Sequence, residues 1–234
     1  MATRSAIINV MAKACYKVSR TLLRDFGEVE QLQVSRKGPA DFVSTADIGA
    51  EKKLVEELSQ ARPTFGFLLE EGKPVESKDP KGRRWIIDPL DGTTNFLHGI
   101  PHWALSLGLE EEGEIVAGAI YDPTRDELFW AEKGIGAFLN DRRIRASERR
   151  NLADCVFATG IPFLGNRDHD RFTDQLRAVM AATAGVRRQG AASLDLAYVA
   201  AGRYDGFWEN GLKPWEIAAG IILLKEAGGY ITDM

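Results

Sequence analysis

The sequence has no long apolar run and very little cysteine. No stretch of its 234 residues is apolar for long enough to cross a membrane as a helix, so we expect no membrane partner. Its two cysteines, Cys15 and Cys155, lie in apolar surroundings, which favours reduced core residues of a cytoplasmic protein. The first residues lack a signal-peptide pattern, because Lys13, Lys17 and Arg20 interrupt the apolar positions.

An excess of charge of either sign is also missing. Thirty Lys and Arg residues stand against 34 Asp and Glu residues, a net charge of −4, which argues against direct binding of nucleic acid. The arginines of residues 142–150 are interrupted and flanked by acids, which is typical of a solvated face. Low-complexity segments, linkers and internal repeats are absent as well. A chain of this length can bury a sizeable core, as one large domain or two small ones.

Several motifs for nucleotide, zinc or nucleophile chemistry are missing. Gly134–Gly136 lies between predicted strands and lacks the rest of a dinucleotide fingerprint, and no P-loop is present. No serine or cysteine nucleophile motif stands out. His98 and His102 have the spacing of a helical zinc pair, but Gly99 and Pro101 disfavour a helix between them. Zinc and covalent catalysis are therefore disfavoured.

What the chain does contain is the stretch Arg84–Phe96, RWIIDPLDGTTNF. The run Trp85–Ile87 is short, aromatic and β-branched, which predicts a buried strand. We expect Asp88–Pro89 to end that strand, because proline cannot donate to a sheet ladder. Asp91–Gly92 then turns the chain, and Thr93–Thr94 is suited to cap a following helix.

This arrangement places Asp88 and Asp91 at the carboxyl end of a strand, where ligands bind in α/β sheets. Carboxylates favour a hard cation, and the free amides at a helix start favour an anion such as phosphate. The fragment by itself is also good chemistry for a plain surface turn. Other acids that follow apolar elements make the ligand site the stronger interpretation.

Alternating and helical apolar patterns predict the remaining elements and an α/β or α+β sandwich of several layers. The predicted helices are residues 5–25, a second helix from Asp47 as N-cap to Pro63, residues 168–182, Gly190–Ala201, and Trp215–Ala227 after Pro214. The predicted strands are Val29–Val34, Phe65–Leu69, an antiparallel meander of Trp103–Leu109, Ile115–Tyr121, Glu127–Ala131 and Gly136–Leu139, then residues 155–159, Tyr204–Trp208 and Tyr230–Thr232.

Six acids lie at the ends of apolar elements, and crowded carboxylates are costly unless a cation neutralises them. They are Asp41, Glu70, Asp88, Asp91, Glu209 and Glu216. If four or more converge, the oxygen ligands favour magnesium, calcium or manganese. A cation beside helix-start amides predicts hydrolysis of a phosphate ester by a metal-activated water. Thr93 would orient that water, and Asp41 would take its proton.

Three separate blocks, Leu69–Gly72, Trp85–Phe96 and Leu212–Gly220, resemble the inositol monophosphatase family. The similarity extends over nearly the whole chain, and Arg187–Tyr198 is especially like bacterial members. The resemblance implies one domain over residues 1–234, a layered αβαβα sandwich of the sugar-phosphatase type, two or three Mg²⁺ ions, inhibition by lithium and a homodimer. Relatives usually continue beyond Met234 through another strand and helix, so we expect either that this sequence is a shortened product or that its sheet has an uncovered edge.

The resemblance also implies roles for individual residues. The first metal would be held by Glu70, Asp88 and the carbonyl of Leu90, and the second by Asp88, Asp91 and Glu216. Catalysis would use Thr93 paired with Asp41, together with Glu70. The phosphate would meet the amides of Gly92 and Thr93, and the alcohol would meet Gly190, Ala191, Ala192 and Glu209.

One of these residues departs from the family pattern. The family usually has aspartate where this chain has Glu216. Glutamate keeps the charge but is one methylene longer, so it must fold back or push the second metal outward. Because Mg²⁺ tolerates little distortion, we expect weaker binding at that site.

Inositol 1-phosphate is the leading substrate, because the carboxylate of Glu209 accepts hydrogen bonds from polyol hydroxyls. The alternatives are histidinol phosphate, fructose 1,6-bisphosphate and 3′-phosphoadenosine 5′-phosphate. A different class of function also fits the resemblance, since some bacterial relatives act through contacts with the transcription machinery. The two classes differ in whether a metal-site variant such as Asp88→Asn keeps its cellular role.

Overall fold

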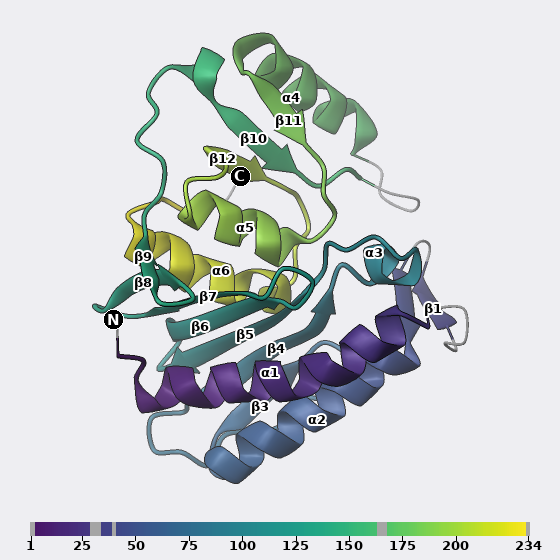
Figure 1. Ribbon diagram of the computed structural model, residues 1–234, viewed down its shortest axis with the longest axis vertical. Coiled ribbons are helices and arrows are strands. Elements are labelled where there is room, and N and C mark those ends of the chain that lie inside the picture. Colours follow the sequence, from purple (N-terminus) through teal and green to yellow (C-terminus); the bar gives the residue numbers. More distant parts are fainter. Residues whose placement is uncertain (1–2, 29–33, 39–40, 163–167, 233–234) are drawn as a thin grey trace.

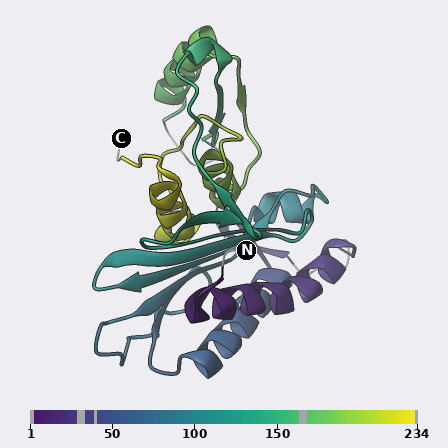
Figure 2. The same ribbon diagram turned by 60° about the vertical axis from the view of Figure 1, so that its left-hand side comes forward.

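The computed structural model describes residues 3–28, 34–38, 41–162 and 168–232, which form five alternating layers of helix and sheet (Figures 1 and 2). In order, the layers are the helices α1 and α2, a seven-stranded sheet, the helices α5 and α6, a three-stranded sheet, and the helix α4. The expected αβαβα sandwich is confirmed.

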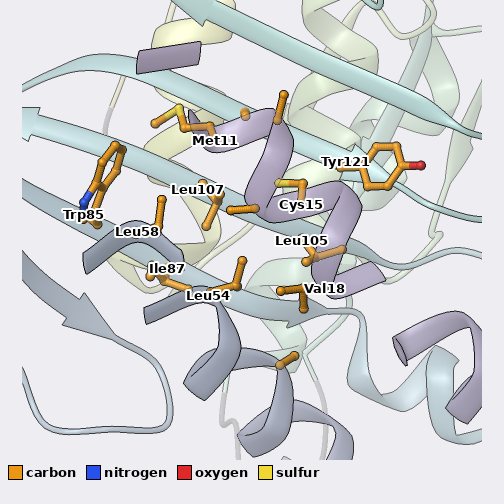
Figure 3. Packing of buried hydrophobic residues seen from close by; sticks show 14 of the residues in the cluster. Met11, Cys15, Val18, Leu54, Leu58, Trp85, Ile87, Leu105, Leu107 and Tyr121 are labelled. Atoms are coloured by element: carbon orange, nitrogen blue, oxygen red, sulfur yellow. The ribbon is translucent and has the colours of Figure 1, made fainter. Parts of the chain in front are cut away.

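The first layer begins with α1 (Ala6–Phe26), whose apolar face covers the large sheet. Met11, Cys15 and Val18 recur at helical spacing and are fully buried, as the pattern predicts. Figure 3 shows these side chains directed at Leu105 and Leu107 of the sheet. This packing fixes α1, and α2 beside it, against one face of the sheet.

The second helix, α2 (Thr45–Ala61), begins two residues before the expected N-cap. Ser44 is the N-cap, and its hydroxyl accepts from the amides of Ala46 and Asp47. Asp47 lies at the third helical position and its Oδ2 accepts from the Ser44 amide at 2.8 Å. This reciprocal capping box places Asp47, fully buried, at the start of α2. The assignment of Asp47 as the N-cap itself was wrong.

The seven-stranded sheet has the order β3-β4-β5-β6-β7-β8-β9. The strands are β3 (Gly66–Leu69), β4 (Arg84–Asp91), β5 (Ala104–Glu111), β6 (Glu114–Asp122), β7 (Glu127–Glu132), β8 (Gly136–Leu139) and β9 (Arg142–Ile144). The pair β3 and β4 is parallel, and every following pair is antiparallel. The predicted meander is confirmed, with β9 as an additional strand.

The proline of the central stretch does not end β4, contrary to expectation. The strand pairs with β5 at Asp88↔Ser106 and again at Asp91↔Ala104, so three steps along β4 match two along β5. The extra residue forms an irregularity that accommodates Pro89, which has no amide to donate. Asp88 and Asp91 therefore lie on either side of a bulge in a buried strand.

The opposite face of the sheet is covered by α5 (Ala192–Ala200) and α6 (Pro214–Ala227). A parallel sheet of β11 (Gly185–Arg187), β10 (Val156–Thr159) and β12 (Gly206–Trp208) follows, with α4 (His169–Ala182) outside it. Apart from the strand expected at Tyr230–Thr232, the predicted helices and strands of this half are therefore present, with shifted ends. No helix in the described part of the chain is long and apolar enough to span a membrane.

Two expected strands differ. Residues 29–33 of the predicted strand Val29–Val34 lie outside the described residues, and Val34 opens β1 (Val34–Gly38), which pairs with β2 (Asp41–Ser44). Tyr230–Thr232 is not a strand, and Tyr230 is 95% exposed. Within the described residues no strand pairs with it, and a lone apolar segment cannot complete a ladder by itself.

Candidate active site

The site begins where two parallel strands end side by side. In the β3–β4 pair, Leu69 lies opposite Ile87, so the next residues, Glu70 and Asp88, emerge at the same edge of the sheet. This is the convergence that the sequence predicts from two apolar strands followed by acids. The side chain of Asp88 is 2% exposed, and Glu70 is half-buried.

Asp88 is a buried acid surrounded by other acids. Its Oδ1 accepts from the Leu90 amide at 3.0 Å. Burial, followed by the charges of Glu70 and Asp91, raises the pKa of Asp88 well above its usual range, and Glu216 adds to the effect. The charged groups that chiefly raise this pKa are therefore all acids. Such a carboxylate favours either a proton or a cation.

Asp91 is held by the start of α5. Its Oδ2 accepts from the amide of Ser193 at 2.7 Å and from the Ser193 hydroxyl. Burial raises the pKa of Asp91 to about 6, although these hydrogen bonds act in the opposite direction. Ser193 was not among the predicted site residues. The only local signal was its place in the predicted helix start, since 102 residues separate it from Asp91.

Thr93 contacts an acid that was not among the predicted site residues, Asp47. Its hydroxyl lies 3.0 Å from Oδ1 of Asp47 and 3.1 Å from the Leu90 carbonyl. Burial raises the pKa of Asp47, and hydrogen bonds from Ser44 and Thr93 oppose that rise. Asp41 lies in β2, but its side chain is outside what the structure describes. The structure adds Asp47 as an observed partner of Thr93, and the predicted pairing of Thr93 with Asp41 stays a prediction.

The turn at Gly92, which is expected to bind phosphate, lies directly after Asp91. Gly92, with φ of +93°, is the N-cap of the short helix α3 (Thr93–Leu97). A Cβ at Gly92 would lie 3.1 Å from the His102 carbonyl oxygen, so this left-handed, tightly packed position requires glycine. Thr93 is thus the first helical residue and not the cap, because its hydroxyl is engaged by Asp47. The role of the Gly92 and Thr93 amides in binding phosphate stays a prediction.

The predicted alcohol side comes from the second half of the chain. Gly190 and Ala191 lead into α5, Ala192 is its first residue, and Glu209 directly follows β12. Burial, together with the charges of Glu216 and Asp91, raises the pKa of Glu209 to about 7. The acids of both halves therefore influence one another electrostatically.

Two further residues on this side were not predicted. A Cβ at Gly160 would fall 1.9 Å from the carboxyl carbon of Glu209, so a larger residue there would displace that carboxylate. Asp195 is 1% exposed, and burial with the charges of Asp91 and Glu209 raises its pKa to about 8. Asp195 lies in the first turn of α5.

Glu216 is folded back on its own helix. Its Oε2 accepts from the Lys213 amide at 2.6 Å, at the start of α6. The fold-back expected of the longer side chain is therefore present. The same carboxylate still raises the pKa of both Asp88 and Glu209.

A divalent cation fits this donor set by charge and by chemistry. The carboxylates are oxygen donors, and the charges of Glu70, Asp91 and Glu216 all raise the pKa of Asp88. Among the described residues, however, no three His, Cys, Asp or Glu side chains are already arranged as a closed ligand set. The ligands therefore need side-chain adjustment to close on an ion.

Cavity size does not locate this site. A groove of about 430 Å³ lies along α1 and contains none of the predicted site residues. A small cavity beside Glu209 is lined by Gly160, Phe172 and Trp208 among others. The convergence of buried acids identifies the site, because such acids are expensive to maintain without a ligand.

A model of the inositol monophosphatase family matches residues 3–234. The chain belongs to the inositol monophosphatase family. The match covers both halves from which the site is built, and members of this family are metal-dependent phosphatases that hydrolyse phosphate monoesters. The resemblance carried by the three sequence blocks is thereby confirmed.

Individual relatives are similar to this chain over nearly its whole length. The chain is 58% identical to an inositol-1-monophosphatase of Rhizobium meliloti (strain 1021), over 98% of this chain and 86% of the relative. It is 43% identical to a Nus factor SuhB of Pseudomonas aeruginosa, over 97% of this chain and 85% of the relative. The crystal structure of the extragenic suppressor protein suhB from Bartonella henselae superposes with a TM-score of 0.95 at 59% identity, covering 98% of this chain and 88% of that one.

Proposed function

We propose that this protein hydrolyses the phosphate monoester of a small polyol with the help of Mg²⁺, with inositol 1-phosphate as the first candidate. One observation carries the proposal: Glu70, Asp88 and Asp91 meet at the end of two buried strands, beside the hydrogen-bonded pair of Thr93 and Asp47. Relatives named inositol-1-monophosphatase at 58% and 59% identity support the choice of substrate.

Two or three Mg²⁺ ions would be held by Glu70, Asp88, Asp91, Glu216 and the carbonyl of Leu90. When bound, such a cation lowers the pKa of a coordinated water and neutralises charge that develops on the phosphate and the leaving oxygen. Lithium inhibition belongs to the same proposal.

Thr93 and Asp47 are suited to orient the attacking water and accept its proton. The Thr93 hydroxyl has one hydrogen, and the Asp47 carboxylate is a stronger acceptor than the Leu90 carbonyl. With that hydrogen committed to Asp47, the lone pairs of the hydroxyl oxygen are left to accept a hydrogen bond from water. As the water attacks phosphorus, its proton passes to the Thr93 oxygen while the Thr93 proton moves to Asp47.

Glu209 would bind hydroxyl groups of the alcohol. It accepts such hydrogen bonds best when ionised, and its pKa near 7 is raised partly by Glu216 and Asp91. Cations held by those two acids would oppose the rise and favour the ionised form. Gly190, Ala191 and Ala192 would present backbone and small side chains to the same alcohol.

The test is phosphate release by the purified protein from inositol 1-phosphate, histidinol phosphate, fructose 1,6-bisphosphate and 3′-phosphoadenosine 5′-phosphate. Each substrate is assayed with Mg²⁺, with EDTA and with added Li⁺. The proposal expects the highest kcat/KM with inositol 1-phosphate, dependence on Mg²⁺ and inhibition by Li⁺. If Mg²⁺-dependent release is fastest from another of these four compounds, that compound replaces inositol 1-phosphate as the proposed substrate. If a folded protein releases phosphate from none of them, the proposed function is rejected.

Glu216→Asp is expected to lower the Mg²⁺ concentration that gives half-maximal activity, by roughly threefold to tenfold. Glu216 is folded back onto the Lys213 amide, whereas the shorter side chain would direct its oxygens at the second cation without bending. The measurement is a Mg²⁺ titration of phosphate release for both proteins. Glu226→Asp on the same helix is the control, since the Glu226 carboxylate binds the amides of Gly134 and Gly136. If Glu216→Asp leaves the Mg²⁺ concentration for half-maximal activity unchanged, Glu216 does not weaken the second cation site.

A second candidate function is regulation through contacts with the transcription machinery. The observation in its favour is the 43% identity to a relative named Nus factor SuhB. A strain that carries Asp88→Asn distinguishes the phosphatase function from the regulatory one. Retention of the cellular role without phosphatase activity would support the regulatory function, and loss of both would support catalysis as the role.

We extend the proposal to a homodimer in the cytoplasm that binds neither membrane nor nucleic acid directly. The family resemblance supports the dimer, and two buried cysteines without a disulfide are typical of a reducing compartment. Size-exclusion chromatography with light scattering tests the oligomeric state.

A further inference from the structure

Asn95, in α3, is a buried polar residue of the stretch Arg84–Phe96 to which the proposed chemistry assigns no role. It is 4% exposed. Its side-chain nitrogen lies 2.7 Å from the carbonyl oxygen of His102, 2.8 Å from that of Gln189 and 3.4 Å from that of Gly190. All three partners are acceptors, so the amide NH₂ group, not its oxygen, faces them.

These contacts join α3 to the chain just after it and to a loop more than 90 residues further along. The His102 carbonyl lies directly under the turn, because a Cβ at Gly92 would be 3.1 Å from it. Gln189 and Gly190 belong to the loop that enters α5 from the other half of the molecule. The NH₂ group has two hydrogens. Its shortest contact, to the His102 carbonyl, lies in the first half of the molecule, and its next shortest, to the Gln189 carbonyl, lies in the second half.

The packing at the loop is equally close. Gly190 has φ of +84°, and a Cβ there would lie 3.3 Å from the Asn95 nitrogen and 2.8 Å from Nη1 of Arg188. The loop therefore rests directly on the Asn95 amide. Further along, Asp91 holds the first turn of α5 through Ser193. Asn95 and Asp91 thus fix two successive points of the same segment.

We propose that Asn95 is a positioning residue that sets the distance between the turn Asp91–Thr93 and the loop Gln189–Ala191, and thereby selects the alcohol part of the substrate. This rests on the proposed function, which assigns the turn to phosphate and the loop to the alcohol. Asn95 touches neither part of the ester and acts through the backbone that does.

Asn95→Asp tests the role with almost no change in size. The new carboxylate places an acceptor against three carbonyl oxygens in a buried site, which repels the loop. We expect KM for inositol 1-phosphate to rise roughly tenfold or more, since small displacements of binding groups have large effects. The kcat/KM for p-nitrophenyl phosphate, whose aryl group offers no hydroxyls to the loop, is expected to stay within about twofold.

Asn140→Asp is the matched control. Asn140 also contacts backbone, through the amide of Leu128 and the carbonyl of Asp126, but it lies after β8, away from the acids. The Asn140→Asp change introduces the same charge as Asn95→Asp, but it should leave KM and kcat/KM for both esters unchanged. Equal losses on both esters in Asn95→Asp, as a general structural defect would give, would overturn the positioning role.

Hydrogen exchange supplies a readout that needs no catalysis. In Asn95→Asp the amides of residues 188–193 are expected to exchange at least tenfold faster, with α1 unchanged, and Asn95→Ala should show the same pattern if the charged variant folds poorly. Unchanged exchange in both variants would overturn the inference. Wild-type protein that releases no phosphate from either ester would reject the proposed function alone, and the exchange result would still decide whether Asn95 fixes the loop.

Discussion

Replacing Asp88 with asparagine is expected to abolish phosphate release and, at the same time, to stabilise the metal-free protein at pH 8. Asp88 is the acid at the centre of the cluster, where Glu70, Asp91 and Glu216 all act on it. Its loss removes an oxygen donor shared by both predicted cations, so we expect kcat/KM to fall roughly a thousandfold or more. The stability gain has a separate physical origin.

Burial and neighbouring acids raise the pKa of Asp88, so the folded protein holds a proton there more tightly than the unfolded chain does. The unfolded chain therefore binds fewer protons above the ordinary pKa of aspartate, near 4, and the stability of the metal-free protein falls as the pH rises through that value. Asp91, with a pKa of about 6, and Asp195, with a pKa of about 8, extend the fall towards pH 8. Asparagine carries no charge, so the variant does not lose the stability that the wild type loses when Asp88 ionises.

The measurement is the melting temperature in EDTA at pH 5 and pH 8, and again at pH 8 with Mg²⁺. We expect Asp88→Asn to melt several degrees above the wild type at pH 8 in EDTA, since about 1 kcal/mol corresponds to roughly 2–4 °C in a chain of this size. The difference should shrink at pH 5 and reverse with Mg²⁺, which stabilises only the protein that binds it. Asp174→Asn, on exposed α4, should change neither quantity. A variant that is less stable at pH 8 in EDTA would contradict this account of the cluster.

The parts of the site that lie within one element were predictable from the sequence. The run Trp85–Ile87 identified a buried strand, and the apolar residues before Glu70 identified a second one. The parallel pairing of these two strands, which the sequence did not predict, brings the acids that follow them to one edge of the sheet. The helices and the meander followed from their periods in the same way.

The partners of those acids were not predictable, because they depend on how distant elements pack. Asp47 has a local role in the capping box, and that role uses Oδ2. Its other oxygen reaches Thr93, 46 residues further along, only because α2 packs beside β4. Ser193 is likewise brought to Asp91 by the docking of α5. Pro89 was misjudged for a related reason, since the pairing with β5 tolerates one extra residue.

The second large effect concerns Thr93 and its acid. Thr93→Val keeps the shape of the side chain but removes the hydroxyl, and kcat is expected to fall by about 10²–10⁴-fold, the range for loss of general acid–base assistance. Thr93→Ser keeps the hydroxyl and is the matched control, with kcat expected within roughly tenfold of the wild type. The Mg²⁺ midpoint should change little in either variant, because the hydroxyl is not among the predicted cation ligands.

Asp47→Asn decides which acid receives the proton. The carboxylate of Asp47 accepts from Thr93 through Oδ1, and an amide at that position is a far weaker proton acceptor. We expect a loss in kcat similar to that of Thr93→Val, and no further loss when the two changes are combined, because residues that act as one unit are not additive. Asp41→Asn, made in parallel, should leave most of kcat intact. If Asp41→Asn instead matches Thr93→Val and Asp47→Asn adds independently to it, then Asp41 is the acceptor, and the contact between Thr93 and Asp47 serves only to hold α2 against the turn.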